Sequence, residues 1–550
     1  MKAALFLAPI LLGNLLVATL SRAAEAEADL CIYGGTSGGV IAAAQAARLG
    51  LTVIVLEPGG HLGGMTSGGL SWTDVGSSSQ VTAVGGLPRE FYERVGAKYG
   101  LPTGSRFGAP NGDNNIKGYD WRKPPSLAFE PKVAEAVFGE LAHDPKISVY
   151  LHSRLAGVWR EGTRIRQLVT EDHRVFGAKM FLDATYEGDL LARAGITFAL
   201  GREANSQYGE THNGAQPPGR GRFEVPIDPY LIAGHPESGP LPYLLSSDLW
   251  NKPGSADRRI QSYNYRACLT DDPANRVPIA PPADYNPDNF ELLARWTQAR
   301  VAAGQKLTLR SYCKYDPLPH HKFDFNNRWP ISTDYIGHAD AYTEASTAER
   351  AQIAKEHENY LRGFFHFLAT DPRIPANVRH EMSSFGLCRD EFPDTAGWPD
   401  QLYVREARRM VGAFVMKEDN VRGILQAPDS VGLGVYGVDS HAVRRLIFEG
   451  QPMLEVQEPA AVPHPYPIAY GSIVPRSAEC ENLFATFALS ASHVAFASIR
   501  MEPVFMALSQ SAATAAWIAI RDGVPVQQVS YSKLRKRLLT DHALLDWPGR

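Results

Sequence analysis

Apolar and polar positions near the amino terminus follow an order that predicts a strand, a turn and a helix. A short apolar run, residues 30–33, ends in the six residues GGTSGG, residues 34–39. Small and apolar residues then recur at helical spacing over residues 40–47. A second apolar run, residues 51–56, predicts another strand that ends at Glu57. The pattern therefore predicts a β-α-β unit at the start of the fold.

Farther along the chain the periodicity changes character. Residues 129–135 are predicted to open a helix, and a run of alternating strands is predicted to start at residues 147–151. Over residues 201–400 prolines and aromatic residues are frequent and helical periodicity is patchy, except over residues 292–303 and 348–368. A long helix without a breaker is predicted again over residues 504–520. We therefore expect a separate unit in the middle of the chain.

The turn of the β-α-β unit has the residues that hold a diphosphate. Glycines allow a sharp turn and a close approach to a pyrophosphate, and a helix N-terminus offers free N–H groups and positive potential. The carboxylate at the end of the second strand is placed to accept hydrogen bonds from a ribose. A threonine replaces the middle glycine of G-x-G-x-x-G. The predicted dinucleotide site consists of Gly34, Gly35, Thr36, Ser37, Gly38, Gly39 and Glu57.

Two other glycine patterns have to be weighed. Gly35, Ser37 and Gly39 also match G-x-S-x-G, the nucleophile elbow of serine hydrolases. That elbow follows several strands of a sheet, whereas only one strand is predicted here, so we interpret Ser37 as a helix cap or a phosphate contact. Residues 432–437 match G-x-G-x-x-G literally but lack the small residues of a packed helix after them. We interpret them as a loop, which removes the case for a separate NAD domain.

An apolar run over residues 3–20 precedes the predicted fold. It follows Met1 and Lys2, and small residues close it at positions 23, 24 and 26. This pattern is typical of a secretory signal peptide over residues 1–26. A membrane anchor is the competing interpretation, but Pro9 interrupts the run. We expect an exported protein, periplasmic or secreted, with no stable membrane span after cleavage.

Composition narrows the possible partners. In 550 residues, 55 Lys+Arg against 59 Asp+Glu leave a net charge of −4, so no basic field attracts nucleic acid.

None of the five cysteines forms a close pair in the sequence, which excludes a zinc knuckle and a redox dithiol, and we expect no metal site. Cys31 belongs to an apolar strand. Spacing selects no disulfide among the remaining cysteines, Cys268, Cys313, Cys388 and Cys480.

Three segments resemble a known family. Residues 58–70, PGGHLGGMTSGGL, follow Glu57, and with the GGT-x-x-G turn they resemble the exported FAD-dependent oxidoreductase family of the glutathione-reductase-like flavoproteins. The family tract reads E-P-x-G-H-L-G-G-M, and this chain has one glycine more. Residues 181–189 resemble the D-A-T-x-x-G-D element of the family. Residues 490–503, SASHVAFASIRMEP, resemble its signature S-x-S-H-V-A-x-x-S-I-R-x-E-P.

The resemblance implies an α/β fold, with a Rossmann-like FAD-binding domain and an inserted α+β substrate domain. The expected FAD-binding domain comprises residues 27–200 and 401–550, and the inserted domain residues 201–400. FAD is expected to be non-covalent, although His61 in the glycine tract could anchor it. Asp189 could instead be an ordinary helix cap. Further residues that the resemblance places at the cofactor are Gly63, Gly64, Met65, Asp183, Asp189 and Arg500.

Flavin enzymes that transfer two electrons need an acid or a base beside the reacting bond. His493 is the first candidate and His441 the second, and the two remain alternatives. Arg500, just before the last long helix, is expected to add positive charge at the flavin. The competing interpretation is that it pairs with Glu502 or another carboxylate at the surface.

We expect a flavoprotein oxidoreductase with a small polar substrate. A carbohydrate or a related hydroxylated compound is among the candidates. A secreted polysaccharide-associated binding protein, in which FAD is only structural, is the alternative. The oligomeric state stays open.

Overall fold

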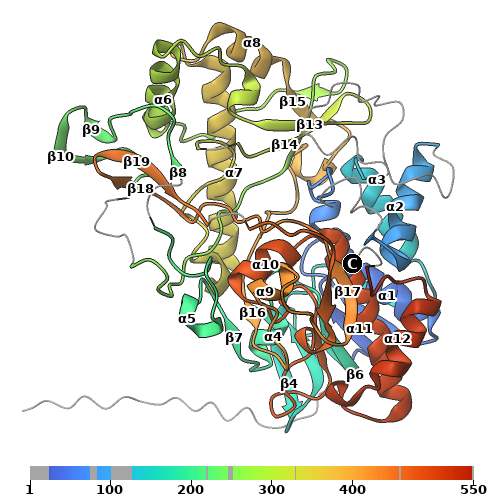
Figure 1. Ribbon diagram of the computed structural model, residues 1–550. Helices are drawn as coiled ribbons and strands as arrows, with labels where there is room; N and C mark the ends of the chain where they lie inside the picture. Colours follow the sequence, from blue (N-terminus) through green and yellow to red (C-terminus); the bar gives the residue numbers. More distant parts are fainter. Residues whose placement is uncertain are drawn as a thin grey trace, which may run out of the picture.

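The computed structural model of the protein describes residues 24–74, 83–100, 127–217, 221–245, 252–328, 330–457 and 460–547 (Figure 1). Of the predicted signal peptide, residues 1–23 lie outside the described residues. Strand β1 begins at Ala26, and the N–H of Glu25 already donates to the carbonyl of Val175 at 2.8 Å.

A mixed sheet of seven strands forms the base of the molecule (Figure 1). Its order is β3-β2-β1-β6-β5-β4, and β21 pairs with the end of β6. The pairings of β2 with β3 and β1, and of β6 with β1 and β21, are parallel. The pairings of β5 with β4 and with the start of β6 are antiparallel. Because β1 and β21 both pair with β6, the two ends of the chain share one sheet. The strands are β1 (Ala26–Tyr33), β2 (Val53–Leu56), β3 (Ile147–Tyr150), β4 (Leu155–Glu161), β5 (Arg164–Thr170), β6 (Val175–Asp183) and β21 (Leu483–Ala485).

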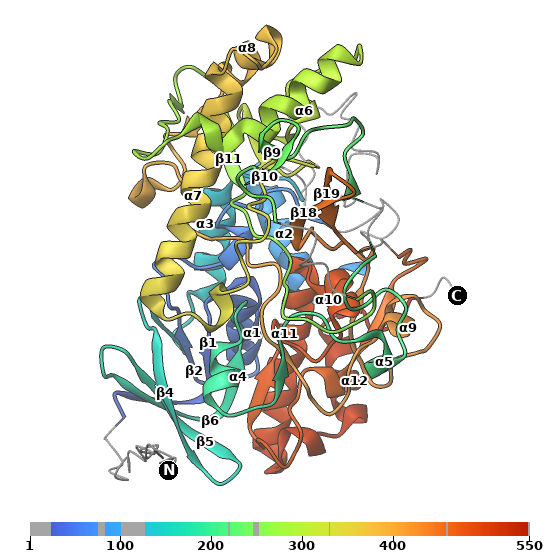
Figure 2. The ribbon, with the colours of Figure 1, turned by 90° about the vertical axis from the view of Figure 1, so that its left-hand side faces the viewer.

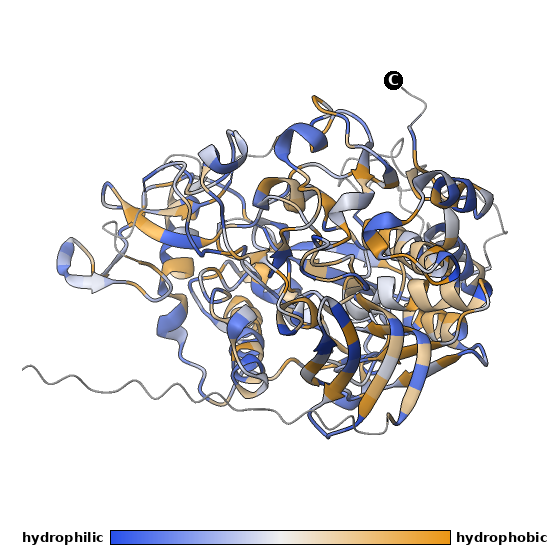
Figure 3. Ribbon diagram, turned by 90° about the horizontal axis from the view of Figure 1, so that it is seen from below, coloured by the Kyte–Doolittle hydropathy of each residue, from blue (hydrophilic) through white to orange (hydrophobic). Residues whose placement is uncertain are grey.

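Helices from both ends of the chain pack on this sheet. The predicted helices near residues 40 and 504 are confirmed as α1 (Ser37–Arg48) and α11 (Glu502–Asp522), which lie side by side (Figure 2). A Cβ on Gly38 would lie 2.4 Å from Ser509 Oγ, so glycine permits this close approach. Seen from below, many residues of the strands and helices at the right of Figure 3 are hydrophobic. The neighbouring helices are α2 (Gly86–Lys98), α3 (Pro131–Ala142) and α12 (Tyr531–Thr540).

Among the described residues, α11 alone is long and apolar enough to cross a bilayer. However, 83% of its apolar window is buried inside the protein, as is typical of a core helix.

The middle of the chain forms an antiparallel sheet covered by helices. The sheet order is β12-β15-β11-β14-β13. The two helices predicted in this region are confirmed as α6 (Glu291–Ala302) and α7 (Thr347–Thr370), the long yellow helix of Figure 1. Ser346 and Glu349 form a capping box at the start of α7. The other elements are α8 (Ala376–Ser384), β11 (Ala267–Thr270), β12 (Arg276–Val277), β13 (Lys314–Leu318), β14 (Lys322–Asn326) and β15 (Gly386–Cys388).

Short strands connect the middle of the chain with the carboxy-terminal part. β8 (Gly221–Arg222) pairs with β19 (Gln451–Glu455), which in turn pairs with β18 (Arg444–Phe448). β7 (Phe198–Ala199) pairs with β16 (Arg409–Met410). The remaining helices and strands are α4 (Asp189–Arg193), α5 (Asn205–Tyr208), β9 (Tyr230–Ile232), β10 (His235–Pro240), α9 (Glu418–Val421), β17 (Ser430–Gly434), β20 (Tyr466–Ala469) and α10 (His493–Ile499).

The loop predicted over residues 432–437 is wrong for its first half. β17 includes Gly432 and Gly434 and pairs with β20, because Val431 and Leu433 are buried and the edge of β20 is available. The next element along the chain is β18, so no dinucleotide helix follows this glycine pattern.

Candidate flavin and substrate site

Thr36 shapes the turn between β1 and α1. Its Oγ1 accepts the N–H of Gly39 at 3.2 Å and donates to the carbonyl of Ala184 at 2.7 Å. Thr36 is therefore the helix cap, rather than Ser37, because its side chain reaches the N–H three residues on. Within the described part of the chain, the N–H groups of Ser37 and Gly38 have no hydrogen-bond acceptor. They are free donors at the N-terminus of a twelve-residue helix.

Glu57 faces this turn from the end of β2. Its Oε2 accepts the N–H of Gly35 at 2.7 Å, and its Oε1 accepts the N–H of Gly59 at 2.6 Å. Burial raises the pKa of Glu57 to about 7, although both N–H groups act in the opposite direction. The carboxyl group lies at the carboxyl end of a parallel strand, where Rossmann-like sheets bind a ribose.

The glycine tract crosses back over the turn. The N–H of Gly63 donates to the carbonyl of Gly35 at 2.8 Å, and a short 3₁₀ helix, η1 (Gly64–Thr66), follows. The N–H of Met65 donates to the Tyr186 hydroxyl at 2.8 Å. Gly64 has φ 54°, and a Cβ there would lie 2.6 Å from this hydroxyl. The structure thus brings the tract and the turn together.

Glu502 connects the turn, η1 and α11. Its Oε2 accepts from Ser37 Oγ at 2.5 Å and from Thr66 Oγ1 at 2.8 Å, and its Oε1 accepts from the Tyr186 hydroxyl at 2.8 Å. Burial raises the pKa of Glu502, and the three donors oppose that shift. A carboxylate in the first turn of a helix also interacts favourably with the helix dipole.

Arg500 lies two residues earlier and faces a different group. Its Nη1 donates to the Tyr403 hydroxyl at 3.0 Å, and its Nη2 lies 3.3 Å from Asp439 Oδ2. A pair with Glu502 is not found, because Arg500 is buried and Glu502 accepts from other donors. The carboxylate that Arg500 meets is that of Asp439. The Asp439 side chain is 48% exposed while that of Arg500 is 2% exposed, so Asp439 presents its carboxylate to an accessible space.

His441 belongs to the same group. Its Nδ1 lies 2.6 Å from Asp334 Oδ2, and its Nε2 lies 3.6 Å from Asp439 Oδ2. Burial would raise the pKa of Asp334, but the charges of Arg405 and His441 lower it. The partly enclosed position of Asp439 would also raise its pKa, but His441 and then Arg500 lower it. Both carboxyl groups are therefore ionised, and that of Asp334 orients the imidazole ring.

His493 has different partners. Its ring Nδ1 lies 2.8 Å from Glu406 Oε1, and its backbone N–H donates to Glu203 Oε2 at 3.0 Å. Arg409 pairs with both glutamates. Burial lowers the pKa of His493 to about 3, and the charge of Arg409 contributes. The structure therefore brings His441 and Arg500 together and places His493 in a separate buried ionic cluster.

Two residues predicted to contact the cofactor form hydrogen bonds or ion pairs with other residues of the chain. The fully buried Asp183 accepts the N–H groups of Thr185 at 3.0 Å and Leu191 at 2.8 Å. Asp189 pairs with Arg350 of α7 at 2.6 Å and with Arg408 at 2.8 Å. These carboxylates connect β6 and α4 with neighbouring elements, and the helix cap at α4 is Gly188 rather than Asp189.

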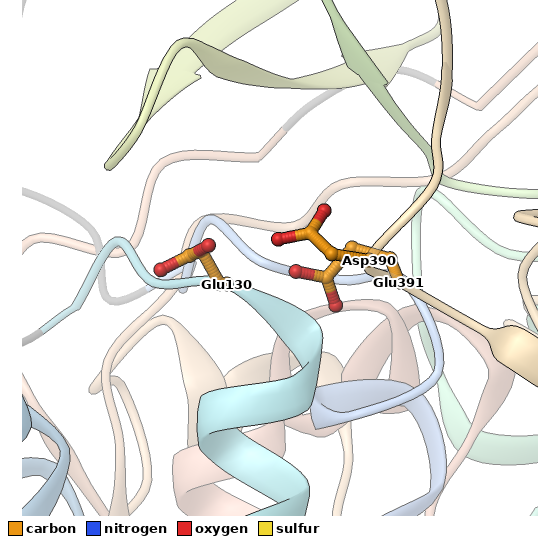
Figure 4. A group of neighbouring side chains, drawn as sticks. All are labelled: Glu130, Asp390 and Glu391. Carbon is orange, nitrogen blue, oxygen red and sulfur yellow. The ribbon is translucent and has the colours of Figure 1, made fainter. Parts of the chain in front are cut away.

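One acidic cluster among the described residues has metal-like spacing. Oxygen atoms of Glu130, Asp390 and Glu391 lie within 4.8 Å of one another (Figure 4). The ammonium group of Lys322, which is 0% exposed, lies 2.6 Å, 2.8 Å and 2.5 Å from these carboxylates. A built-in cation thus occupies the cluster and offsets part of its negative charge.

The parallel β1-α1-β2 unit with its glycine turn defines a dinucleotide-binding α/β protein. The residues present fit FAD. The free N–H groups at the start of α1 suit a diphosphate, Glu57 suits a ribose, and the start of α11 suits the flavin end. The family model described as FAD dependent oxidoreductase matches residues 29–538, and the chain belongs to this family.

Three enzymes are among the solved structures that resemble part of the chain. OxyS anhydrotetracycline hydroxylase from Streptomyces rimosus is 15% identical over 32% of this chain and 36% of its own, with a TM-score of 0.23. L-amino acid deaminase from Proteus vulgaris is 17% identical over 32% and 53%, with a TM-score of 0.23. p-Nitrophenol 4-monooxygenase PnpA from Pseudomonas putida DLL-E4 is 12% identical over 34% and 50%, with a TM-score of 0.22.

These alignments span about a third to a half of each solved structure. Among curated proteins, no match was found.

Sequence reasoning missed three residues of this site. Glu502 stands inside the quoted signature, and its signal was an acidic residue in the first turn of an apolar helix. Asp439 stands two residues before His441. Asp334 had no signal, because it meets His441 only through a contact across 107 positions.

Proposed function

We propose that the protein binds FAD non-covalently in a glutathione-reductase-like domain formed by residues 27–200 and 401–550, with residues 201–400 as an inserted substrate domain. The sheet shared by β1, β6 and β21 supports this division. His61 supports non-covalent binding, because its Nδ1 is engaged by Glu135 at 2.8 Å and its Nε2 lies 3.5 Å from Asp400.

FAD retention tests this binding mode. Replacing Glu57 by Ala removes the acceptor for ribose hydroxyls, and we expect FAD binding to weaken by about 1.5–3 kcal/mol, as for a charge-assisted hydrogen bond. The dissociation constant is measured by flavin fluorescence. Glu161→Ala, on the exposed part of β4, is the control and should leave it unchanged. Equal FAD affinity in all three proteins would remove Glu57 from the site.

The proposed reaction is a two-electron oxidation or reduction of a small polar substrate. Bound FAD would supply the hydride acceptor or donor. His441 would take or give the substrate proton at Nε2, while Asp334 at Nδ1 holds the ring in the required tautomer. Arg500 would hold Asp439 in place and add positive charge near the cofactor.

One observation carries the proposal: three consecutive residues connect the predicted cofactor turn with the His441 group. Arg500 contacts Asp439 and Tyr403, and Glu502, two residues on, contacts Ser37 at the turn. The start of α1 would hold the diphosphate of FAD, and Arg500 and Asp439 would serve its flavin end. The accessible Asp439 carboxylate and the His441 imidazole are groups that recognise hydroxyls, which supports a hydroxylated substrate.

Stopped-flow measurement of flavin reduction tests the role of His441. Replacing His441 by Gln should slow reduction by a panel of sugars and hydroxy acids roughly 100-fold or more, with FAD still bound. His493→Gln is the matched variant, and we expect it to retain reduction in the folded protein. The reverse order would return the acid/base role to His493. Bound FAD that no compound reduces would favour the binding-protein alternative.

We also propose that the protein is exported to the periplasm or beyond. The apolar run over residues 3–20 and the small residues after it support this. Because the N–H of Glu25 donates to the carbonyl of Val175 and β1 begins at Ala26, cleavage at or before Ala24 would preserve the start of β1. Amino-terminal sequencing of protein from the periplasmic fraction tests it.

A further inference from the structure

Two cysteines lie against each other in the sheet of the middle region. The Sγ atoms of Cys268 on β11 and Cys388 on β15 are 3.8 Å apart, and both residues are 0% exposed. The Cys388 thiol also lies 3.4 Å from the carbonyl oxygen of Cys268. All five cysteines are among the described residues, and no other two have their sulfur atoms in contact.

The strand register places these two residues directly opposite each other. β11 and β15 are antiparallel, with Leu269 opposite Leu387 and Thr270 opposite Gly386. The next pair in this register is Cys268 and Cys388. Opposed residues of antiparallel strands have Cα atoms about 4.5–5.5 Å apart, which lies within the range of about 4.4–6.8 Å found for disulfides. Rotation of the two side chains can therefore bring the sulfur atoms to bonding distance without a change of backbone register.

We propose that Cys268 and Cys388 form a disulfide when the chain folds in an oxidising compartment, while Cys31, Cys313 and Cys480 remain thiols. The oxidant is a small or protein disulfide, represented here by oxidised glutathione. One cysteine thiolate attacks the glutathione disulfide, and a glutathione thiolate leaves. The other cysteine then displaces the second glutathione. In total two cysteine thiols lose two electrons and two protons, and one oxidised glutathione becomes two reduced ones.

Such a bond would join the first and the last strand, in chain order, of the sheet of the middle region. The two cysteines are separated by 120 positions, and α6, α7 and α8 lie between them. A cross-link over so long a segment restricts the unfolded chain strongly. Asp390 and Glu391 stand two and three residues after Cys388 and hold the buried Lys322. The disulfide would therefore also fix the segment that carries these two carboxylates.

The test counts thiols and maps the linked peptides. The full chain is unfolded, reduced, refolded in a mixture of reduced and oxidised glutathione, and then alkylated under denaturing conditions. We expect three alkylated cysteines of the five in the sequence. Tryptic peptides 267–276 and 380–389, each with one cysteine, should appear as one species that a reductant splits.

Two variants control the assignment. Cys313→Ser should leave two alkylated cysteines and the same linked peptide, because Cys313 takes no part. Cys268→Ser should leave four alkylated cysteines and no linked peptide. Five alkylated cysteines in the refolded wild-type chain would overturn the proposal, as would a link that includes Cys31, Cys313 or Cys480. The wild-type result does not depend on whether either variant folds.

Discussion

At the scale of single residues, Glu502 shows how one carboxyl group can unite a site. It is buried at the first position of α11 and receives three hydroxyl donors from three different segments. Leaving a buried donor without its acceptor costs more than a typical hydrogen bond contributes, because the donor has also lost its water. The arrangement of turn, η1 and α11 is therefore sensitive to this side chain.

Replacing Glu502 by Gln should lower the free energy of unfolding by about 1–3 kcal/mol. The amide keeps the shape but has only one acceptor oxygen, so either Tyr186 or the two hydroxyls of Ser37 and Thr66 lose their acceptor. Urea unfolding followed by circular dichroism measures the loss. Asp522→Asn, at the exposed end of the same helix, should change stability by less than about 0.5 kcal/mol. Equal stability of the Glu502 variant and the wild type would contradict this account.

At the scale of elements, Lys322 on β14 holds α3 and the segment after β15 together. Its ammonium group contacts Glu130, the residue before α3, and both acidic residues that follow β15. Three carboxylates so close together repel one another unless a cation lies between them. The docking of the middle region on α3 therefore depends on one buried charge.

Replacing Lys322 by Met should destabilise the protein by about 3–5 kcal/mol, because it leaves buried carboxylates without a counter-charge. Lys132 contacts the same cluster but its side chain is 43% exposed, so Lys132→Met should cost no more than about 1 kcal/mol. Thermal unfolding of both variants gives the comparison. Similar melting temperatures for the two would show that burial does not distinguish these lysines.

At the scale of the whole molecule, His493 makes stability depend on pH. Burial lowers the pKa of His493 to about 3, below the value of about 6.5 in an unfolded chain. Between these two values the unfolded chain binds a proton that the folded protein excludes, so stability decreases as the pH falls below about 6.5.

The contribution of His493 should reach up to about 3 kcal/mol at pH 4.5. His493→Gln should therefore lose less stability than the wild type when the pH is lowered from 7 to 4.5. The comparison uses the slopes of urea-unfolding free energy against pH, because the variant also loses the hydrogen bond to Glu406. His173→Gln, at an exposed position, should keep the wild-type slope. A variant slope equal to that of the wild type would show that His493 is protonated in the folded protein.

The sequence by itself determined the local elements and the family of this protein. Apolar periodicity and turn residues predict the glycine turn, α1, α7 and α11. These signals involve residues that are close together in sequence, so they can be recognised without knowing how the rest of the chain folds. The position of Glu57 could be predicted for the same reason, since strand and turn are adjacent in sequence.

Only the tertiary structure decided which distant residues meet. Asp334 with His441, Arg500 with Asp439, and Cys268 with Cys388 come together through sheet register and the packing of segments up to 120 positions apart. No local period records such contacts, because they depend on how the whole chain closes around its core. The histidine that shares a site with Arg500, and the pairing of the cysteines, could therefore be read only from the folded molecule.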